Sequence, residues 1–438
     1  MKRVWGRMAR CGLTGNGGEK GGAQGGPVRG VVAVLTALIA TYMISQFQRS
    51  AIGVIGPDLS RELALDASRL GFLSSAFFLT FALAQIPVGI AIDRYGARNT
   101  LIVSALIAAA GSLLFAMAQT GTGLIAARAL IGLGCASFFM APLAIYARRF
   151  PAERFAMLTS LTLGAGSLGT LVATAPLAAI SAWIGWRGAF FGMAVLTGVI
   201  ILAVMLALPA RRSSGDEARE SWGEALKGVG HALQVRSFWN VFALHATTYS
   251  AFACIVGLWA GPWLADIHGA GLQERGNLIL LAAAAQITGI FAWGASDRWF
   301  RSYRRAALTG GGLGVSLLLA AALLPLEGAG LAIWLVLFGL AFGYVPIVTS
   351  HGKALFPQRL TGRGITLMNI ATMGGVFVSQ ALTGLLVATF APLPDGGYPR
   401  EAYTAVFLAL AAALALALAF YLRAIDPHPS RPGSGFDT

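Results

Sequence analysis

Residues 89–98 read Gly89-Ile90-Ala91-Ile92-Asp93-Arg94-Tyr95-Gly96-Ala97-Arg98, and they join two long apolar runs. A second acidic–basic pair, Asp297-Arg298, follows an apolar run near residue 294, six runs further along the chain. Gly89 and Gly96 permit close helix approach and a tight turn in the first copy. Two such pairs six runs apart predict a chain built from two related halves.

The composition indicates a membrane protein. Of 438 residues, 56% are apolar and 11% are charged, whereas soluble domains carry roughly 25% charged residues. The net charge of +14 comes from basic residues that lie between apolar runs, without the interleaved aromatic residues of a single-strand nucleic-acid binder. We therefore expect a lipid bilayer, and no nucleic acid, as the surroundings. Cys11, Cys135 and Cys254 are too scattered for a disulfide framework and are expected to be packing residues.

Each of the apolar runs is long enough to cross about 30 Å of hydrocarbon as a helix. None shows the short alternating pattern of a membrane β-barrel. The sequence therefore predicts an all-α integral membrane protein with twelve transmembrane helices in two six-helix pseudo-symmetric bundles. The runs cover approximately residues 31–55, 70–91, 100–119, 122–147, 155–180, 188–209, 238–264, 277–295, 306–325, 330–350, 364–390 and 402–422.

Lys and Arg residues concentrate in the tails and in every even-numbered loop, which predicts that both termini are cytoplasmic. We expect a multi-pass protein of a bacterial inner (plasma) membrane. The longest interior polar stretch follows the sixth run and divides the chain six plus six. The predicted parts are a disordered basic cytoplasmic tail (1–29), an N-terminal bundle (30–209), a cytoplasmic linker (210–236), a C-terminal bundle (237–424) and a cytoplasmic tail (425–438).

Residues 89–98 resemble the signature Gly-x-x-x-Asp-Arg-x-Gly-x-Arg that transporters of the major facilitator superfamily carry between helices 2 and 3. The resemblance covers about residues 30–424. It implies a transporter that rocks around a central cavity and, as for most members, works as a monomer. A charge cluster of this kind can lock one state and release another; alternatively, the arginines only mark topology. The predicted gating residues are Gly89, Asp93, Arg94, Gly96, Arg98, Asp297 and Arg298.

Arg128 lies within the fourth run, in a segment that resembles the superfamily's helix-4 motif. The resemblance implies a role in proton coupling. An intramembrane arginine is costly and is a functional hypothesis by default. The alternatives are a purely structural role or a side chain that snorkels to the membrane surface.

The first run places Tyr42, Gln46 and Arg49 on one helical face, which would be costly toward lipid and is therefore expected to face the cavity. All 18 acidic residues fall outside the apolar cores. Arg49 resembles the substrate-gripping arginine of organophosphate antiporters, and its planar fork suits a carboxylate or phosphate. Residues 251–257 lack the second arginine of those antiporters, so a small organic carboxylate is favoured. Alternatively, Arg49 snorkels outward.

Polar residues in later runs are the other candidates for substrate contact. His245 could carry a proton near neutral pH or simply be a packing residue, and the tryptophans near residue 260 could belong to an interfacial belt. Asn369 and Gln380 are candidate orienting groups. The full predicted substrate-binding set is Arg49, Gln46, Tyr42, His245, Tyr249, Trp259, Asn369 and Gln380.

The chain has no catalytic constellation, metal-ligand spacing or phosphate-binding loop, so we expect neither an enzyme nor a cofactor. The sequence predicts a secondary active transporter of a small organic anion, coupled to protons or working by exchange. One alternative is a proton-driven exporter of drugs or hydrophobic metabolites, although helix 5 retains Pro176 without the glycines of that class. Another is a transporter-like membrane sensor.

Overall fold

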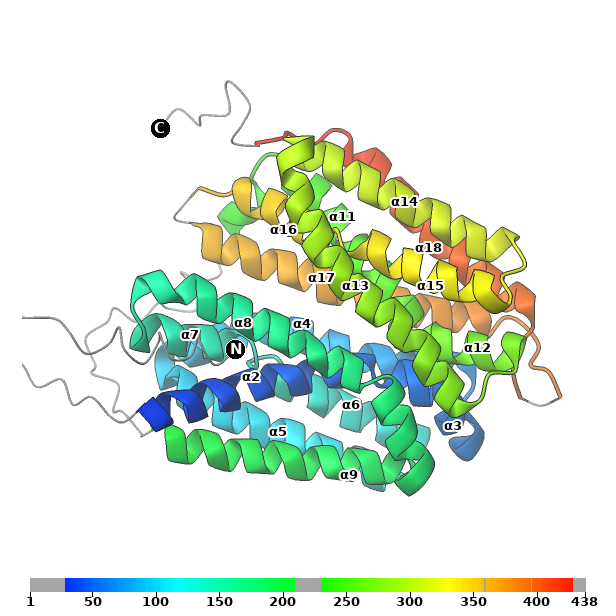
Figure 1. Ribbon diagram of the computed structural model, residues 1–438, viewed down its shortest axis with the longest axis horizontal. Helices are drawn as coiled ribbons and strands as arrows, with labels where there is room; N and C mark the ends of the chain where they lie inside the picture. Colours follow the sequence, from blue (N-terminus) through cyan, green and yellow to red (C-terminus); the bar gives the residue numbers. More distant parts are fainter. Residues whose placement is uncertain (1–27, 209–229, 358–359, 395, 428–438) are drawn as a thin grey trace, which may run out of the picture.

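The computed structural model describes residues 28–208, 230–357, 360–394 and 396–427 (Figure 1). The predicted N-terminal tail lies almost wholly outside the described residues, as does most of the linker and of the C-terminal tail. Within the described part the chain is helical throughout its spans and contains no strand. The all-α prediction is therefore confirmed.

Six membrane-spanning segments make up the N-terminal half, and two of them consist of two helices in sequence. Ala51, between the first two helices, keeps helical backbone angles, and Gly185 kinks the last helix with a φ of 73°. The helices are α2 (Val28–Ser50) with α3 (Ile52–Leu63), α4 (Ala67–Tyr95), α5 (Ala97–Met117), α6 (Gly121–Cys135) with α7 (Met140–Arg149), α8 (Ala152–Val172) and α9 (Ala175–Ala207).

The C-terminal half repeats this arrangement with six further segments. They are α11 (Phe238–Cys254) continued by the π-helical turn η1 (Ile255–Trp259) and α12 (Ala260–His268), then α13 (Leu272–Phe300), α14 (Tyr303–Leu323), α15 (Gly328–Phe342) with α16 (Val345–Ala354), α17 (Thr361–Val387) and α18 (Arg400–Tyr421). Eleven of these segments, counting each joined set of helices as one, are long and apolar enough within the described residues to cross a membrane. The α2–α3 pair is the twelfth segment, as predicted.

The helices extend beyond the apolar runs from which they were predicted. Asp93 and Arg94 form the last turn of α4, where a loop was expected, and only Gly96 separates α4 from α5. Gly96 has a φ of 83°, a conformation that glycine adopts without a steric penalty. The predicted tight turn is therefore present, but it is one residue long. Asp297 and Arg298 likewise lie inside α13, and their side chains are outside the described set.

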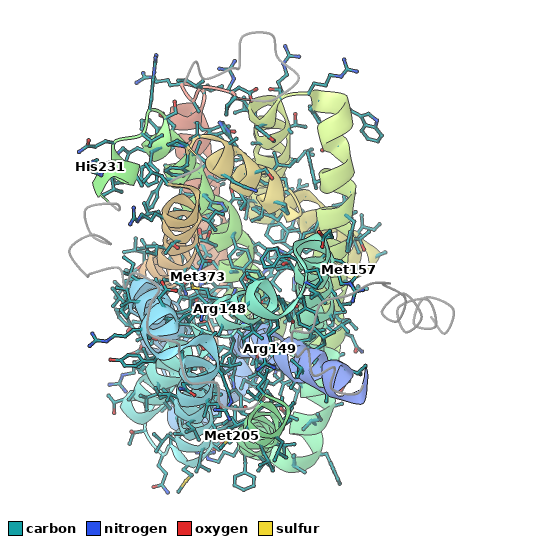
Figure 2. The ribbon with its side chains drawn as sticks, turned by 90° about the vertical axis from the view of Figure 1, so that its left-hand side faces the viewer. Arg148, Arg149, Met157, Met205, His231 and Met373 are labelled. Atoms are coloured by element: carbon teal, nitrogen blue, oxygen red, sulfur yellow. The ribbon has the colours of Figure 1, made fainter. Side chains whose placement is uncertain are left out.

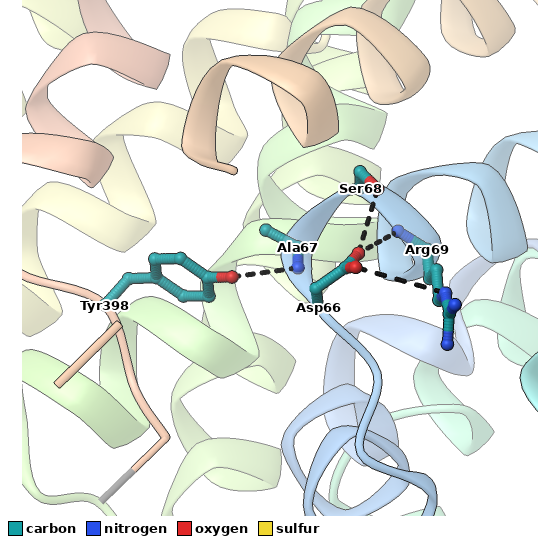
Figure 3. A network of polar contacts seen from close by, with 5 residues as sticks. All are labelled: Asp66, Ala67, Ser68, Arg69 and Tyr398. Carbon is teal, nitrogen blue, oxygen red and sulfur yellow. Dashed lines mark hydrogen bonds and ion pairs between the residues drawn. The ribbon is translucent and has the colours of Figure 1, made fainter. Parts of the chain in front are cut away.

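The most extensive contacts between the two halves join α4 with α17, α9 with α13, and α3 with α12. Figure 1 shows the halves lying one above the other, with α2 beginning and α9 ending at the left. We call this left-hand side the terminal end and the opposite side the sealed end. At the sealed end a polar network holds the start of α4 (Figure 3).

The network begins with Asp66, the N-cap of α4, whose carboxylate accepts hydrogen bonds from the Arg69 N–H (2.7 Å) and the Ser68 hydroxyl (2.9 Å). Partial burial disfavours the charged form, but these bonds outweigh it and lower the pKa of Asp66. The neighbouring Ala67 N–H donates to the Tyr398 hydroxyl of the other half, at 3.1 Å. The helix start is thus capped within one half and tied to the other.

Candidate functional site

A cavity of about 800 Å³ lies between the two halves. It is lined by helices of both, including α2, α8, α11 and α17, and it extends to Gly362 at the start of α17, toward the terminal end. Figure 2 views the molecule from that end; it shows Met373, a lining residue, between the halves, and Arg148 and Arg149 near the end of α7.

The sealed end closes the cavity through direct backbone packing. A Cβ atom at Gly53 would lie 2.2 Å from the carbonyl oxygen of Val256, and one at Gly261 would lie 2.0 Å from that of Gly53. Only glycine permits this approach of α3 to the η1–α12 segment. An ion pair between Asp58 and Arg275 (2.7 Å) adds a charged link between the halves, and the Arg275 side chain is 2% exposed.

Six of the eight predicted substrate-binding residues line the cavity. They are Tyr42, Gln46, Arg49, His245, Tyr249 and Asn369. The polar face of the first helix therefore faces the cavity as predicted, because a lipid-facing position would leave its polar groups unsatisfied.

Among the described residues that line the cavity, Arg49 carries a permanent charge. The same set contains no Asp, Glu or Lys. Its guanidinium carbon lies 4.6 Å from the centre of the Phe81 ring, a distance at which a cation is attracted to an aromatic face. Its buried Nε atom has no hydrogen-bond partner within the described chain. Arg49 thus presents unused donors in a cavity that offers it no carboxylate.

Other polar groups line the same cavity as Arg49. Tyr42 is close enough to Arg49 and Tyr249 to interact electrostatically with both. Gln46 Oε1 and His245 Nδ1 are buried and lack partners among the described residues. The arrangement can donate and accept several hydrogen bonds around a small anion.

The side-chain amide of Asn369 is hydrogen-bonded to Gln85, which is not among the predicted site residues. Its amide donates to Gln85 Oε1 of α4 at 2.8 Å, and this bond links the two halves. Gln85 lies in an apolar run two residues before Pro87, and that isolated polar position was the signal available in the sequence.

Trp259 and Gln380 are not brought to the cavity, so their predicted contact with substrate is not seen in this conformation. The Trp259 indole donates to the Thr383 hydroxyl (2.9 Å), and the Gln380 amide donates to the Ala253 carbonyl (3.1 Å). Trp259 ends the π-helical turn η1. A π-helical turn contains an extra residue, which offsets the side chains beyond it from the face that carries His245.

Arg128 is fully buried and does not line the cavity, so the alternative of snorkelling is wrong. Its Nη1 donates to the carbonyl oxygen of Gln48 at 2.7 Å, and its guanidinium lies 5.0 Å from the Phe77 ring centre. Nε and Nη2 have no partner within the described chain. Because Gln48 precedes Arg49, Arg128 fixes the backbone next to the cavity's charged residue.

The predicted gating residues of the first copy lie at the terminal end. The Arg98 side chain donates to the carbonyl oxygens of Leu208 and Met205, at the end of α9, where a cation is favoured by the helix dipole. A Cβ atom at Gly89 would meet nothing within 4 Å among the described residues, so the predicted close helix approach there is absent from this conformation. No metal-binding cluster of His, Cys, Asp and Glu occurs in the described residues.

Residues 38–380 match the family model described as the Major Facilitator Superfamily. The chain belongs to this superfamily. Members resembling it include a protein of Agrobacterium vitis named for tartrate transport, which is 25% identical over 88% of this chain and 89% of its own. The gentisate transporter of Corynebacterium glutamicum is 24% identical, covering 77% of each chain.

Solved structures of the superfamily show the same fold. A bacterial homologue of the human lysosomal transporter Spinster, in an inward-facing and occupied conformation, has a TM-score of 0.74 at 19% identity and covers 91% of this chain and 97% of its own. The nucleoside transporter NupG has a TM-score of 0.70 at 14% identity, covering 90% and 100%. These structures show that the chain has the fold expected for the superfamily. The family match and the transporter relatives make it a secondary transporter.

Proposed function

We propose that this transporter moves a small organic anion whose carboxylate is bound by Arg49. The observation that carries the proposal is a guanidinium with unused donors in a cavity whose described lining contains no carboxylate. A half-buried charge without a partner in a mostly apolar cavity is costly, and a substrate carboxylate would supply that partner through two parallel hydrogen bonds. Transport of carboxylates by the tartrate and gentisate relatives supports the same substrate class.

The orientation belongs to the same proposal. Arg148, Arg149 and Arg98 lie at the terminal end, and basic residues concentrate on the cytoplasmic side of membrane proteins. We place both termini in the cytoplasm of a bacterial cell, with the cavity open inward. The gating role of Asp93, Arg94 and Arg98, the second gating pair Asp297–Arg298, and the coupling role of Arg128 are parts of this proposal, as is a monomeric carrier.

Uptake of labelled carboxylates into proteoliposomes tests the proposal. Arg49→Ala is expected to lower uptake at least tenfold, because a hydrogen bond to a charged group contributes about 1.5–3 kcal/mol. Arg49→Lys should also weaken uptake, since lysine lacks the planar fork. Arg69→Ala is the matched control, because Arg69 is exposed and lies outside the cavity. If Arg49→Ala transports as well as wild type, the proposal is wrong.

The energy source is tested in the same vesicles. Acceleration by an imposed pH gradient would indicate proton coupling, and acceleration by unlabelled acid inside the vesicles would indicate exchange. Efflux of hydrophobic dyes without carboxylate uptake would favour the drug-exporter alternative. Ligand binding without any transport would favour the sensor.

A further inference from the structure

The exposed wall of the cavity is mostly apolar. Its apolar residues include Phe139, Leu143, Ile287, Ile290, Phe291 and Met368. Among the described lining residues, Arg49 on α2 carries the permanent charge.

Several polar side chains of the wall already have partners within the protein. Hydroxyl groups along the apolar wall donate to carbonyl oxygens one turn earlier in their own helices, at 2.9–3.1 Å. These hydroxyls belong to Ser167, Thr349, Thr366 and Thr372. Gln85 and Asn369 are bonded to each other. Unpaired buried polar atoms among the lining residues, by contrast, belong to Gln46, Arg49 and His245.

A polyhydroxylated diacid would fit this wall poorly. Its second carboxylate would lie away from Arg49 without a cation among the described lining residues, and its hydroxyls would face apolar side chains. Burying polar groups without hydrogen-bond partners is costly. A substrate with one carboxylate and an apolar body would instead place its charge at Arg49 and its body against the apolar wall.

From a mostly apolar wall with Arg49 as its permanently charged residue, we infer that the substrate is an amphipathic monocarboxylate with an aromatic or branched apolar body, rather than a polyhydroxylated diacid such as tartrate. The inference rests on the proposed function, because it assumes that Arg49 binds the carboxylate. The cavity volume of about 800 Å³ lies within the range of pockets that enclose molecules larger than a four-carbon acid. Phe139 and Phe291 provide aromatic faces for such a body.

Calorimetric titration of the purified full-length protein with a series of acids tests the inference. Affinity should rise about fourfold for each methylene group from butanoate to hexanoate, as expected for a buried CH₂. Benzoate should bind at least tenfold more tightly than tartrate. Hexanamide lacks the charge, so its titration measures partition into the detergent micelle. This signal is subtracted from the titrations with the acids.

Variants of the apolar wall provide a second measurement. Ile290→Ser should weaken hexanoate binding about tenfold, in line with the loss of apolar contact in a binding pocket, while Ile290→Leu should bind hexanoate as wild type does. An equal loss in both variants, or none in either, would contradict contact between Ile290 and the substrate body.

The outcomes separate the inference from the proposed function. If tartrate binds more tightly than benzoate, or affinity does not rise with chain length, and Arg49→Ala still abolishes acid binding, the inference is overturned and the proposed function stands. The proposed function falls if hexanoate binds to Arg49→Ala as tightly as to wild type. It also falls if wild type binds hexanoate no more tightly than hexanamide.

Discussion

Removing the charge of Asp58 should loosen the sealed end. Arg275 Nη2 lies 2.7 Å from the Asp58 carboxylate, and the two side chains are 2% and 31% exposed. Leaving a buried charge without its partner typically costs about 3–5 kcal/mol. Because Asp58 is partly exposed, water screens the pair, and about 2 kcal/mol is the appropriate magnitude.

That energy is lost only from the closed arrangement, since Asp58 and Arg275 belong to different halves. A loss of about 2 kcal/mol changes an equilibrium about 30-fold, so Asp58→Asn should increase the population open at the sealed end by that factor. Glu62→Gln is the matched control. Glu62 also lies on α3, but its partner Arg187 belongs to the same half.

Labelling of an introduced cysteine measures the opening. Ala260 is 1% exposed and precedes Gly261 of the seal, so Ala260→Cys should react slowly with a membrane-impermeant maleimide applied from the sealed side. Wild-type protein, which keeps its native cysteines, gives the background labelling. Cys135 and Cys254 should contribute little to it, because both are buried. If Asp58→Asn labels no faster than wild type, or Glu62→Gln accelerates labelling equally, the pair does not hold the seal.

Three further predictions concern backbone contact, buried charge and pH. Gly53→Ala should prevent closure of the sealed end and lower uptake at least tenfold, because its Cβ would overlap the carbonyl oxygen of Val256. Gly56→Ala is the control and should transport normally, because its Cβ would meet only Leu70, at 3.8 Å. Arg128→Met should leave the melting temperature unchanged or raised while uptake falls; a lower melting temperature with normal uptake would contradict this. Asp66 has a lowered pKa, so it contributes stability above pH ~4 that is lost as the pH falls through its folded-state pKa. Melting temperature should therefore fall less between pH 6 and pH 3 in Asp66→Asn than in wild type.

The fold and part of the site follow from local features of the sequence. Apolar runs long enough to span a membrane determine the helices, and the spacing of Tyr42, Gln46 and Arg49 determines a polar face that only a cavity accommodates. Helix ends were less predictable. Helices continue past their apolar runs into the interface, which is why Asp93 lies in the last turn of α4.

The rest of the site depends on contacts between distant segments. The partnership of Gln85 with Asn369 joins residues 284 positions apart, and no local pattern specifies it. The direction of the Trp259 side chain has a local cause of a different kind. A 3.6-residue period extended from His245 fails at the π-helical turn, whose extra residue rotates everything beyond it.

The proposed binding of a monoanion by Arg49 would also determine which step of the cycle responds to voltage. The empty cavity carries one fixed positive charge among its described lining residues, and a bound monoanion cancels it. The loaded carrier therefore reorients as a neutral body, while the empty carrier moves a charge that is worth up to about 2.3 kcal/mol per 100 mV. Exchange of one anion for another should then be indifferent to membrane potential, and net transport, which requires the empty carrier to return, should depend on it.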